Sequence, residues 1–433
     1  MSHLLEQHLA EALAQAPAGP LCVAFSGGPD STALLHALAQ LPAARARGLR
    51  AIHVDHGLHA KSAEWAQHCR AFCNGLALAC EVQRVQVQVG SKLGLEAAAR
   101  QARYDAFSAQ LLAGDILLLA HHRDDQAETV LLKLLRGAGP EGLGGMRPWR
   151  PFASGQLWRP LLGLNGGLLR EYVELAQLRF IEDPSNADTR LGRNHLRHEI
   201  LPRLARHWPQ AVDSIVHSAG LAAAAADALQ QQWLDAFSTL HDPLTGSIDA
   251  DGWLALHAAL REPLLDYWLH ARGLPAPTTA QRRQIERQCQ ARIDRQPRIQ
   301  WPGAELYVWR GRLWSVAPTP PVALDWRARW TGEPVTLPDG GRLALVESEA
   351  RLAEPLELRL RQGGERIKPC GNPHTRELRD LFQQGMIPPW RRISCPLLFA
   401  GKELVAVADR WISARGMAIF QAAGTLPRWT PPA

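Results

Sequence analysis

The chain of 433 residues is 46% hydrophobic and 21% charged, the balance of a folded globular protein, which excludes a disordered chain. Apolar runs such as residues 116–120 fall far short of the ~20 residues that cross a bilayer, which excludes an integral membrane protein. The net charge is +6 and 43 of the 48 basic residues are arginine, so a nucleic-acid partner is favoured but not established.

Residues 20–160 alternate between strand-like and helix-like segments. Short apolar or alternating runs predict four strands, at residues 20–25, 49–55, 82–89 and 115–121. Helical periodicity predicts the helices that follow these strands, at residues 31–41, 62–74, 95–112 and 124–137. This alternation predicts a parallel sheet covered on both faces, with ligands bound beyond the carboxyl ends of its strands.

The rest of the chain has a different pattern. An Ala-rich stretch at 211–237 begins a run of helices that ends near residue 292, and Trp-bearing strands are expected at 298–316. A compact mixed segment runs from about residue 354 to the end. We therefore predict a doubly wound parallel α/β domain at 1–210, a mainly helical middle domain at 211–350, and a small α+β domain at 351–433.

The strongest motif lies between the first predicted strand and its helix, and it reads Ser26, Gly27, Gly28, Pro29, Asp30, Ser31. Two glycines allow a tight turn whose backbone N–H groups face one anion together with the helix N-terminus. The serines add hydroxyl donors, and Asp30 makes sense beside a phosphate if it holds Mg²⁺. The motif is neither a Walker loop nor a GxGxxG fingerprint. We predict a phosphate-binding loop, with a simple capped turn as the alternative.

A second polar group follows the fourth predicted strand: His121, His122, Asp124, Asp125 and Glu128. Asp125 and Glu128 are three residues apart and share one face of the predicted helix. Acids at a helix N-terminus also stabilise the helix by ~0.3–1 kcal/mol each, which is the structural alternative. Since this group and the phosphate loop belong to the same sheet edge, we expect it to hold Mg²⁺ or to receive the ammonium of a cationic substrate.

The phosphate loop resembles the PP-loop of the N-type ATP pyrophosphatases, which cleave ATP between its α and β phosphates. Within that superfamily the chain resembles the tRNA(Ile)-lysidine synthetase family over nearly its whole length. The matching stretches are residues 53–58, 95–107, 120–129, 136–139, 159–162, 182–186, 193–197, 363–369 and 376–412. The resemblance is weakest over about 215–350.

This resemblance implies that the chain uses ATP and Mg²⁺ to ligate L-lysine to the wobble cytidine of an isoleucine tRNA with a CAU anticodon. The C2 carbonyl oxygen attacks the α-phosphate, pyrophosphate leaves, and the lysine ε-amine then displaces AMP to give lysidine. The expected catalytic residues are Asp30, Asp125 and Glu128, with Asp30 as the metal ligand. We expect either Glu128 or Asp125 to be the general base.

The resemblance also implies binding roles for polar residues near the loop. Asp55 and His56, at the end of the second strand, are expected beside the adenine and ribose of ATP. Substrate or tRNA contacts are expected of Arg100, Arg103, His121, Glu182, Arg193, Asn194 and Arg197. The structural alternative for Arg100 and Arg103 is that they are solvated helix charges. For the segment from 182 to 197 it is a surface loop closed by ion pairs.

Basic residues gather in the last predicted domain. Residues 357–393 contain eight bases against four acids, with Trp390 among them. Bases interleaved with an aromatic residue suit RNA, because phosphate contacts and base stacking act together. We expect Arg376 and Arg379 to lie three residues apart on one helix and to grip adjacent phosphates, while a solvated face is the alternative.

Three other classes share part of this pattern. A PP-loop tRNA thiolase needs catalytic cysteines, and no CxxC occurs among the seven cysteines, although a distant pair such as Cys73 with Cys289 stays open. A glutamine-dependent amidotransferase needs a glutaminase domain, and a non-catalytic RNA-binding module would not need Asp30. The N-terminus lacks the features of a signal peptide, which predicts a cytoplasmic protein. The oligomeric state stays open, a homodimer being one option.

Overall fold

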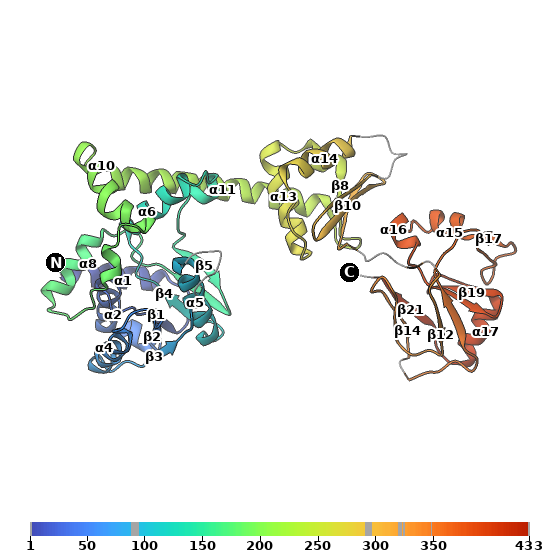
Figure 1. Cartoon of the computed structure of the whole chain (residues 1–433), viewed down its shortest axis with the longest axis horizontal. Coiled ribbons are helices and arrows are strands. Elements are labelled where there is room, and N and C mark those ends of the chain that lie inside the picture. Colours follow the sequence, from blue (N-terminus) through green and yellow to red (C-terminus); the bar gives the residue numbers. More distant parts are fainter. Residues whose placement is uncertain are drawn as a thin grey trace. The chain divides into compact units, whose positions relative to one another are not determined.

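The computed structural model describes residues 2–87, 95–290, 297–318, 323, 325–347 and 349–431. Two compact units make up the chain, Met1–Ala228 and Leu229–Ala433 (Figure 1). Among the described residues, no helix combines the length and apolar character needed to cross a membrane.

The first unit is built on one six-stranded sheet in the order β3-β2-β1-β4-β6-β5. Its strands are β1 (Leu21–Ala24), β2 (Arg50–Asp55), β3 (Cys80–Arg84), β4 (Ile116–Leu118), β5 (Trp149–Phe152) and β6 (Gly155–Trp158). All neighbours are parallel except the β5–β6 hairpin. The strand order reverses beside β1, so the loops after β1 and β4 meet at the point where open α/β sheets bind ligands.

Helices cover both faces of this sheet, which confirms the doubly wound fold. One face packs against α1 (Ser2–Gln15), α2 (Pro29–Gln40), α4 (Ser62–Gly75) and α8 (Gly166–Leu175). The other face packs against α5 (Leu95–Gln110), whose Phe107 lies in a core with Cys22 and Leu117. Adjacent strand residues face opposite cores, since Val23 and Leu118 belong to the first one.

Further helices complete the first unit. They are α3 (Pro42–Ala46), α6 (Arg123–Leu134), α7 (Pro140–Leu143), α9 (Gly192–His195), a π-helical turn at Leu196–Ile200, α10 (Leu201–His207) and the first part of α11 (Ala211–Leu240). The helices expected after the four predicted strands are all present as α2, α4, α5 and α6.

The third strand is shifted from its predicted position at 82–89. It spans Cys80–Arg84 and pairs with β2 as far as Asp55, where β2 ends. Val85 donates one more backbone hydrogen bond to Asp55, and residues 85–87 continue without a partner strand. Residues 88 and 89 lie outside the described residues. The alternation over 82–89 therefore places this strand too far toward the C-terminus, because an edge strand extends only as far as its neighbour, β2, can pair with it.

Among its described residues, the second unit has two separate cores, each built on a five-stranded antiparallel sheet. Helices α12 (Ala250–Ala255), α13 (Ala258–Ala271) and α14 (Thr279–Cys289) pack on the sheet β7-β8-β11-β10-β9. Its strands are β7 (His241–Asp242), β8 (Ser247–Asp249), β9 (Arg298–Trp301), β10 (Ala304–Trp309) and β11 (Arg312–Val316). The helices expected up to residue 292 and the strands expected at 298–316 thus share one hydrophobic core.

The last part follows the predicted α+β pattern. Its main sheet has the order β12-β15-β18-β19-β20, with strands Arg327–Trp330, Leu356–Arg359, Leu397–Ala400, Glu403–Val407 and Trp411–Ile412. The other strands are β13 (Val335–Thr336), β14 (Arg342–Leu345), β16 (Arg366–Ile367), β17 (Arg376–Glu377) and β21 (Pro427–Thr430). The helices are α15 (Leu378–Gln384), α16 (Pro389–Arg392) and α17 (Ala414–Ala422). Because β12 pairs with β15, residues 327–330 share a sheet with strands beyond 351. The domain limits at 210 and 350 stay predictions.

Candidate active site

The phosphate loop joins β1 to α2, as the motif predicts. Ser26 Oγ lies 3.0 Å from Ser31 Oγ and accepts a hydrogen bond from the Gly28 backbone N–H at 3.3 Å. Ser31 Oγ also donates to the Gly28 carbonyl at 3.1 Å, and Pro29 is the first residue of α2. The loop therefore positions two hydroxyls at a helix N-terminus, where an anion is stabilised.

The two glycines of the loop have different roles. Gly27 has φ +82°, and a Cβ there would lie 2.3 Å from Ile181 Cδ1 and 3.0 Å from Cys69 Sγ. Gly28 has φ −72°, and its Cβ would meet only Ser26 Oγ at 3.5 Å, an ordinary contact. Gly27 is thus required by the fold itself, while Gly28 keeps open the space in front of the loop.

His122 joins the loop to the acids that follow β4. Its imidazole lies 3.6 Å from Asp30, 3.3 Å from Asp124 and 3.5 Å from Asp125. Burial alone would lower the pKa of this imidazole, but its hydrogen bonds to Asp124 and Asp30 and the charge of Asp125 raise the pKa to about 10. Three carboxylates thus meet at one imidazole, and together they favour its protonated form.

Four residues form an acid–arginine cluster: Asp125, Glu128, Arg193 and Arg197. Arg197 binds both oxygens of Glu128, at 2.6 and 3.1 Å, and Asp125 Oδ1 at 2.8 Å. Arg193 lies 3.5 Å from Glu128 and donates to the hydroxyl of Thr129 at 2.8 Å. Burial raises the pKa of the fully buried Glu128, and the two guanidiniums oppose that shift. The predicted carboxylate pair thus exists, but it is already neutralised by arginine.

His121 is held by an arginine that sequence reasoning did not single out as a site residue. Arg159 is 5% exposed and donates from Nε to His121 Nδ1 at 3.2 Å. Burial lowers the pKa of His121, and nearby arginines add to this effect, so its imidazole is neutral. Because a guanidinium can only donate, Nδ1 is an acceptor and the proton lies on Nε2. His121 can therefore offer a hydrogen-bond donor at the end of β4.

The end of β2 carries a compact polar turn. Asp55 is buried and accepts the Gly57 backbone N–H at 2.9 Å. Arg103 Nε donates to His56 Nε2 at 3.4 Å. Burial, followed by the charge of Arg103, lowers the pKa of His56 to about 4, so His56 is neutral. The structure thus brings Arg103 to the strand end where nucleotide contacts were expected.

The segment from 181 to 197 contacts the phosphate loop through Ile181. Some of its predicted site residues also contact the acids of α6, and others do not. The Ile181 backbone N–H donates to the Gly27 carbonyl at 2.8 Å, a contact that the sequence did not signal. Asn194 donates its amide to the carbonyls of Ser185 and Asp188, so it shapes the segment itself. Glu182 is exposed. Only Arg193 and Arg197 of this predicted set reach the acids.

The predicted RNA-binding residues of the second unit are arranged differently from expectation. Arg376 lies in β17 and Arg379 in α15, so the prediction of one shared helix was wrong; the helix begins only at Leu378. Trp390 stacks on Tyr307 with ring centroids 4.2 Å apart. Stacking of Trp390 on an RNA base stays a prediction.

The cysteine pair left open for the thiolase alternative, Cys73 with Cys289, is not favoured by the structure. Cys73 is fully buried, and its hydrogen bond to Cys80, together with burial, raises its pKa. Burial likewise raises the pKa of Cys289. A catalytic cysteine must form a thiolate, and neither of these environments stabilises one.

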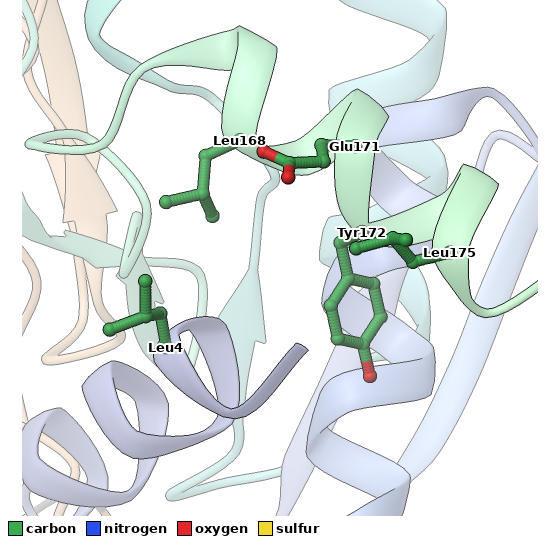
Figure 2. Close-up of a pocket in the computed structure, with 5 residues that line it drawn as sticks. All are labelled: Leu4, Leu168, Glu171, Tyr172 and Leu175. Carbon is green, nitrogen blue, oxygen red and sulfur yellow. The ribbon is translucent and has the colours of Figure 1, made fainter. Parts of the chain in front are cut away.

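A small hollow between α1 and α8 lies outside the polar site. Figure 2 shows its lining of Leu4, Leu168, Glu171, Tyr172 and Leu175. Its volume is about 20 Å³, room for little more than one water. The Tyr172 hydroxyl is already engaged, since it donates to Glu6 at 3.0 Å and contacts His36 at 2.9 Å. This hollow is not a candidate substrate site.

Comparisons with known proteins agree with the geometry. Three family models match: "PP-loop domain" at residues 1–204, "TilS substrate binding domain" at 248–314 and "TilS substrate C-terminal domain" at 356–429. The fold, the loop and the first of these matches define a PP-loop enzyme that uses ATP.

Two similar proteins identify the family within this class of enzymes. A tRNA(Ile)-lysidine synthase of Xanthomonas axonopodis pv. citri is 44% identical, covering 95% of this chain and 94% of that protein. One of Pseudomonas aeruginosa is 40% identical, covering 99% and 97%. The chain belongs to the tRNA(Ile)-lysidine synthase family, which confirms the predicted enzyme class.

A solved structure outside the family is also similar. The U34-tRNA thiolase NcsA from Methanococcus maripaludis is 17% identical with a TM-score of 0.40, covering 50% of this chain and 77% of that one. At this score the likeness supports no conclusion on function.

Proposed function

We propose that this chain ligates L-lysine to the wobble cytidine of an isoleucine tRNA with a CAU anticodon, using ATP and releasing AMP and pyrophosphate. The observation that carries this proposal is the contact of His122 with Asp30 on one side and Asp125 on the other. It joins a phosphate loop to a carboxylate pair, as a site that binds ATP and a cationic amino acid requires.

Asp30 fits the role of a magnesium ligand. Its carboxylate is 39% exposed and lies on the first turn of α2, beside the hydroxyls of Ser26 and Ser31. Magnesium binds through one or two carboxylates together with phosphates, and it neutralises charge on the leaving pyrophosphate. His122 would hold Asp30 in place through its Nε2, which lies 3.6 Å from the carboxylate.

The loop and the end of β2 would bind ATP. The backbone and hydroxyls of Ser26–Ser31 offer donors to the phosphates, and the turn that contains Asp55 and His56 would border the adenine and ribose. Because His121 presents a donor at Nε2, it suits the developing charge on the activated cytidine or the phosphate.

The acid–arginine cluster would receive lysine. Arg197 is 37% exposed, so its guanidinium can yield part of its place between Asp125 and Glu128 to the substrate ammonium. Burial raises the pKa of Glu128 above its usual value, and a carboxylate beside the ammonium site is placed to act as the general base for the lysine amine. Glu128→Gln is therefore expected to raise the lysine KM more than the ATP KM.

The remaining parts of the proposal concern tRNA and surroundings. The domain of residues 351–433, with Arg376 and Arg379, would dock tRNA away from the reacting base, and residues 211–350 would connect it to the catalytic domain of 1–210. The reaction would take place in the cytoplasm.

The test is the stoichiometry of turnover. Purified protein, an unmodified CAU tRNA transcript and ATP should release AMP and pyrophosphate in equal amounts, and sustained release should require lysine. Release of ADP, or turnover that is indifferent to lysine, would refute the proposed reaction.

A further inference from the structure

An arginine–tyrosine cluster lies between α5 and the β5–β6 hairpin of the first unit. We define it as Arg100, Tyr104, Arg150 and Phe152. The guanidinium carbons of Arg100 and Arg150 lie over the Tyr104 ring, 5.0 and 5.4 Å from its centroid. Arg150 also lies 5.3 Å from the centroid of Phe152, whose ring meets Tyr104 edge-on at 5.6 Å. Two cations thus share a two-ring platform.

Both guanidiniums lie against the Tyr104 ring and retain N–H groups that can bind a phosphate. Arg100 uses one of these groups to donate to the Tyr104 hydroxyl at 3.3 Å. Both arginine side chains are exposed, and the platform limits their rotamers before any ligand arrives.

Arginines gather around this cluster. Arg103 and Arg159 lie next to it, and Arg100 adds to the burial that lowers the pKa of each. Among the described side chains, no carboxylate lies within ion-pair distance of Arg100, Arg103, Arg150 or Arg159. Glu96, one turn before Arg100 in the sequence, lies outside the described side chains. A surface that gathers four guanidiniums is suited to a polyanion.

The neighbours of the cluster connect it to the active site. Arg103 donates to His56 at the end of β2, and Arg159 donates to His121 at the end of β4. An anion bound here therefore lies beside the ends of β2 and β4, whereas the donors of the phosphate loop come from α2 and the turn before it. The triphosphate already has donors in that loop, so a second anionic chain is the better occupant.

We propose that the arginine–tyrosine cluster docks the sugar–phosphate backbone of the RNA strand that carries the reacting base. This inference rests on the proposed function for the identity of the RNA. Contacts to single-stranded phosphates hold the strand in register while the base enters the site. Arg150 and the hairpin that bears it thereby become part of the substrate site.

The test uses Arg150→Gln, which removes one exposed charge. Arg170→Gln is the matched control, since Arg170 is an exposed arginine on α8 in the same unit and outside the cluster. The affinity for an unmodified CAU tRNA transcript is measured without lysine at several salt concentrations, and ATP affinity is measured separately. We expect Arg150→Gln to weaken tRNA binding roughly tenfold. The slope of log K against log salt should also fall by about 0.7–0.9.

Other outcomes overturn the inference. They are an equal loss in Arg170→Gln, unchanged tRNA affinity in Arg150→Gln, or a loss of ATP affinity alone, which would assign the cluster to the triphosphate. Wild-type turnover is scored in a separate assay. Failure to form lysidine would refute the proposed function while leaving the binding difference intact, and normal turnover with unchanged binding would refute only the docking surface.

Discussion

The phosphate loop and the acid–arginine cluster follow neighbouring strands but are built in opposite ways. Side-chain hydrogen bonds within the loop join residues no more than five positions apart. Those that link Arg193 and Arg197 to α6 join residues 64 to 72 positions apart. Local sequence thus determines the anion-binding turn, whereas packing of the segment around Arg197 determines how much negative charge the acids present.

The largest expected effect concerns the metal ligand of the loop. Asp30→Asn keeps the shape of the side chain and removes its charge, so we expect adenylation to fall on the order of 100-fold or more with the fold retained. Pyrophosphate release is the measurement. Asp227→Asn, at an exposed ion pair with Arg147, is the control and should be fully active. Full activity in Asp30→Asn would show that Asp30 is not a magnesium ligand.

The two loop glycines separate stability from ligand binding. Gly27→Ala should lower the free energy of unfolding by roughly 2–4 kcal/mol, because φ +82° and the contact with Ile181 both oppose a Cβ. Gly28→Ala should leave stability nearly unchanged but weaken ATP binding. Denaturant unfolding and ATP titration distinguish the pair. Equal stability losses would show that the loop glycines do not differ as described.

The acid–arginine cluster should respond to loss of its cation. Arg197→Ala leaves Glu128 buried with only Arg193 nearby, and we expect a loss of about 2 kcal/mol in the free energy of unfolding. This is less than for a fully buried pair, since Arg197 is partly exposed. Arg190→Ala, which breaks a surface pair with Asp188, should leave stability essentially unchanged. Similar losses in both variants would contradict the difference between the two pairs.

The turn after β2 predicts a sensitivity to acid. His56 has a folded-state pKa of about 4, below its usual 6.5, so the unfolded chain binds the proton first. Its contribution to stability is therefore lost as pH falls from 6.5 toward 4. His56→Gln should show a shallower decline in the free energy of unfolding over this range. Parallel pH profiles for the two proteins would mean that His56 is not buried as a neutral ring.

The smallest effect is expected in the second unit. Replacing both Arg376 and Arg379 with alanine should weaken tRNA binding slightly and lower the salt slope by about one unit per lost phosphate contact. ATP affinity should not change. The double variant Arg283→Ala, Arg287→Ala removes the same charge from α14 and serves as the control. If tRNA affinity depends on salt identically in wild type and in the Arg376, Arg379 double variant, these two arginines are solvated and do not contact tRNA.

Particular residues show how far sequence reasoning reached. The loop, three of the four predicted strands and the acids of α6 could be placed because turn chemistry and hydrophobic periodicity act locally. Arg159, Ile181 and Arg150 could not, because their partners are chosen by tertiary packing. Arg159 reaches His121 from 38 positions away. The basic residues around Trp390 favour RNA binding, but the Trp390 ring packs on Tyr307, a contact that composition cannot reveal.

The central claim is that the loop and the acids act together to join lysine to a cytidine. The most direct measurement is nucleoside analysis of CAU tRNA after incubation with wild-type protein, ATP and isotope-labelled lysine. We expect one cytidine, at the wobble position, to gain the mass of lysine less one water, and Asp30→Asn to leave it unmodified. An unlabelled product, incorporation of sulfur without lysine, or modification at another base would contradict the account.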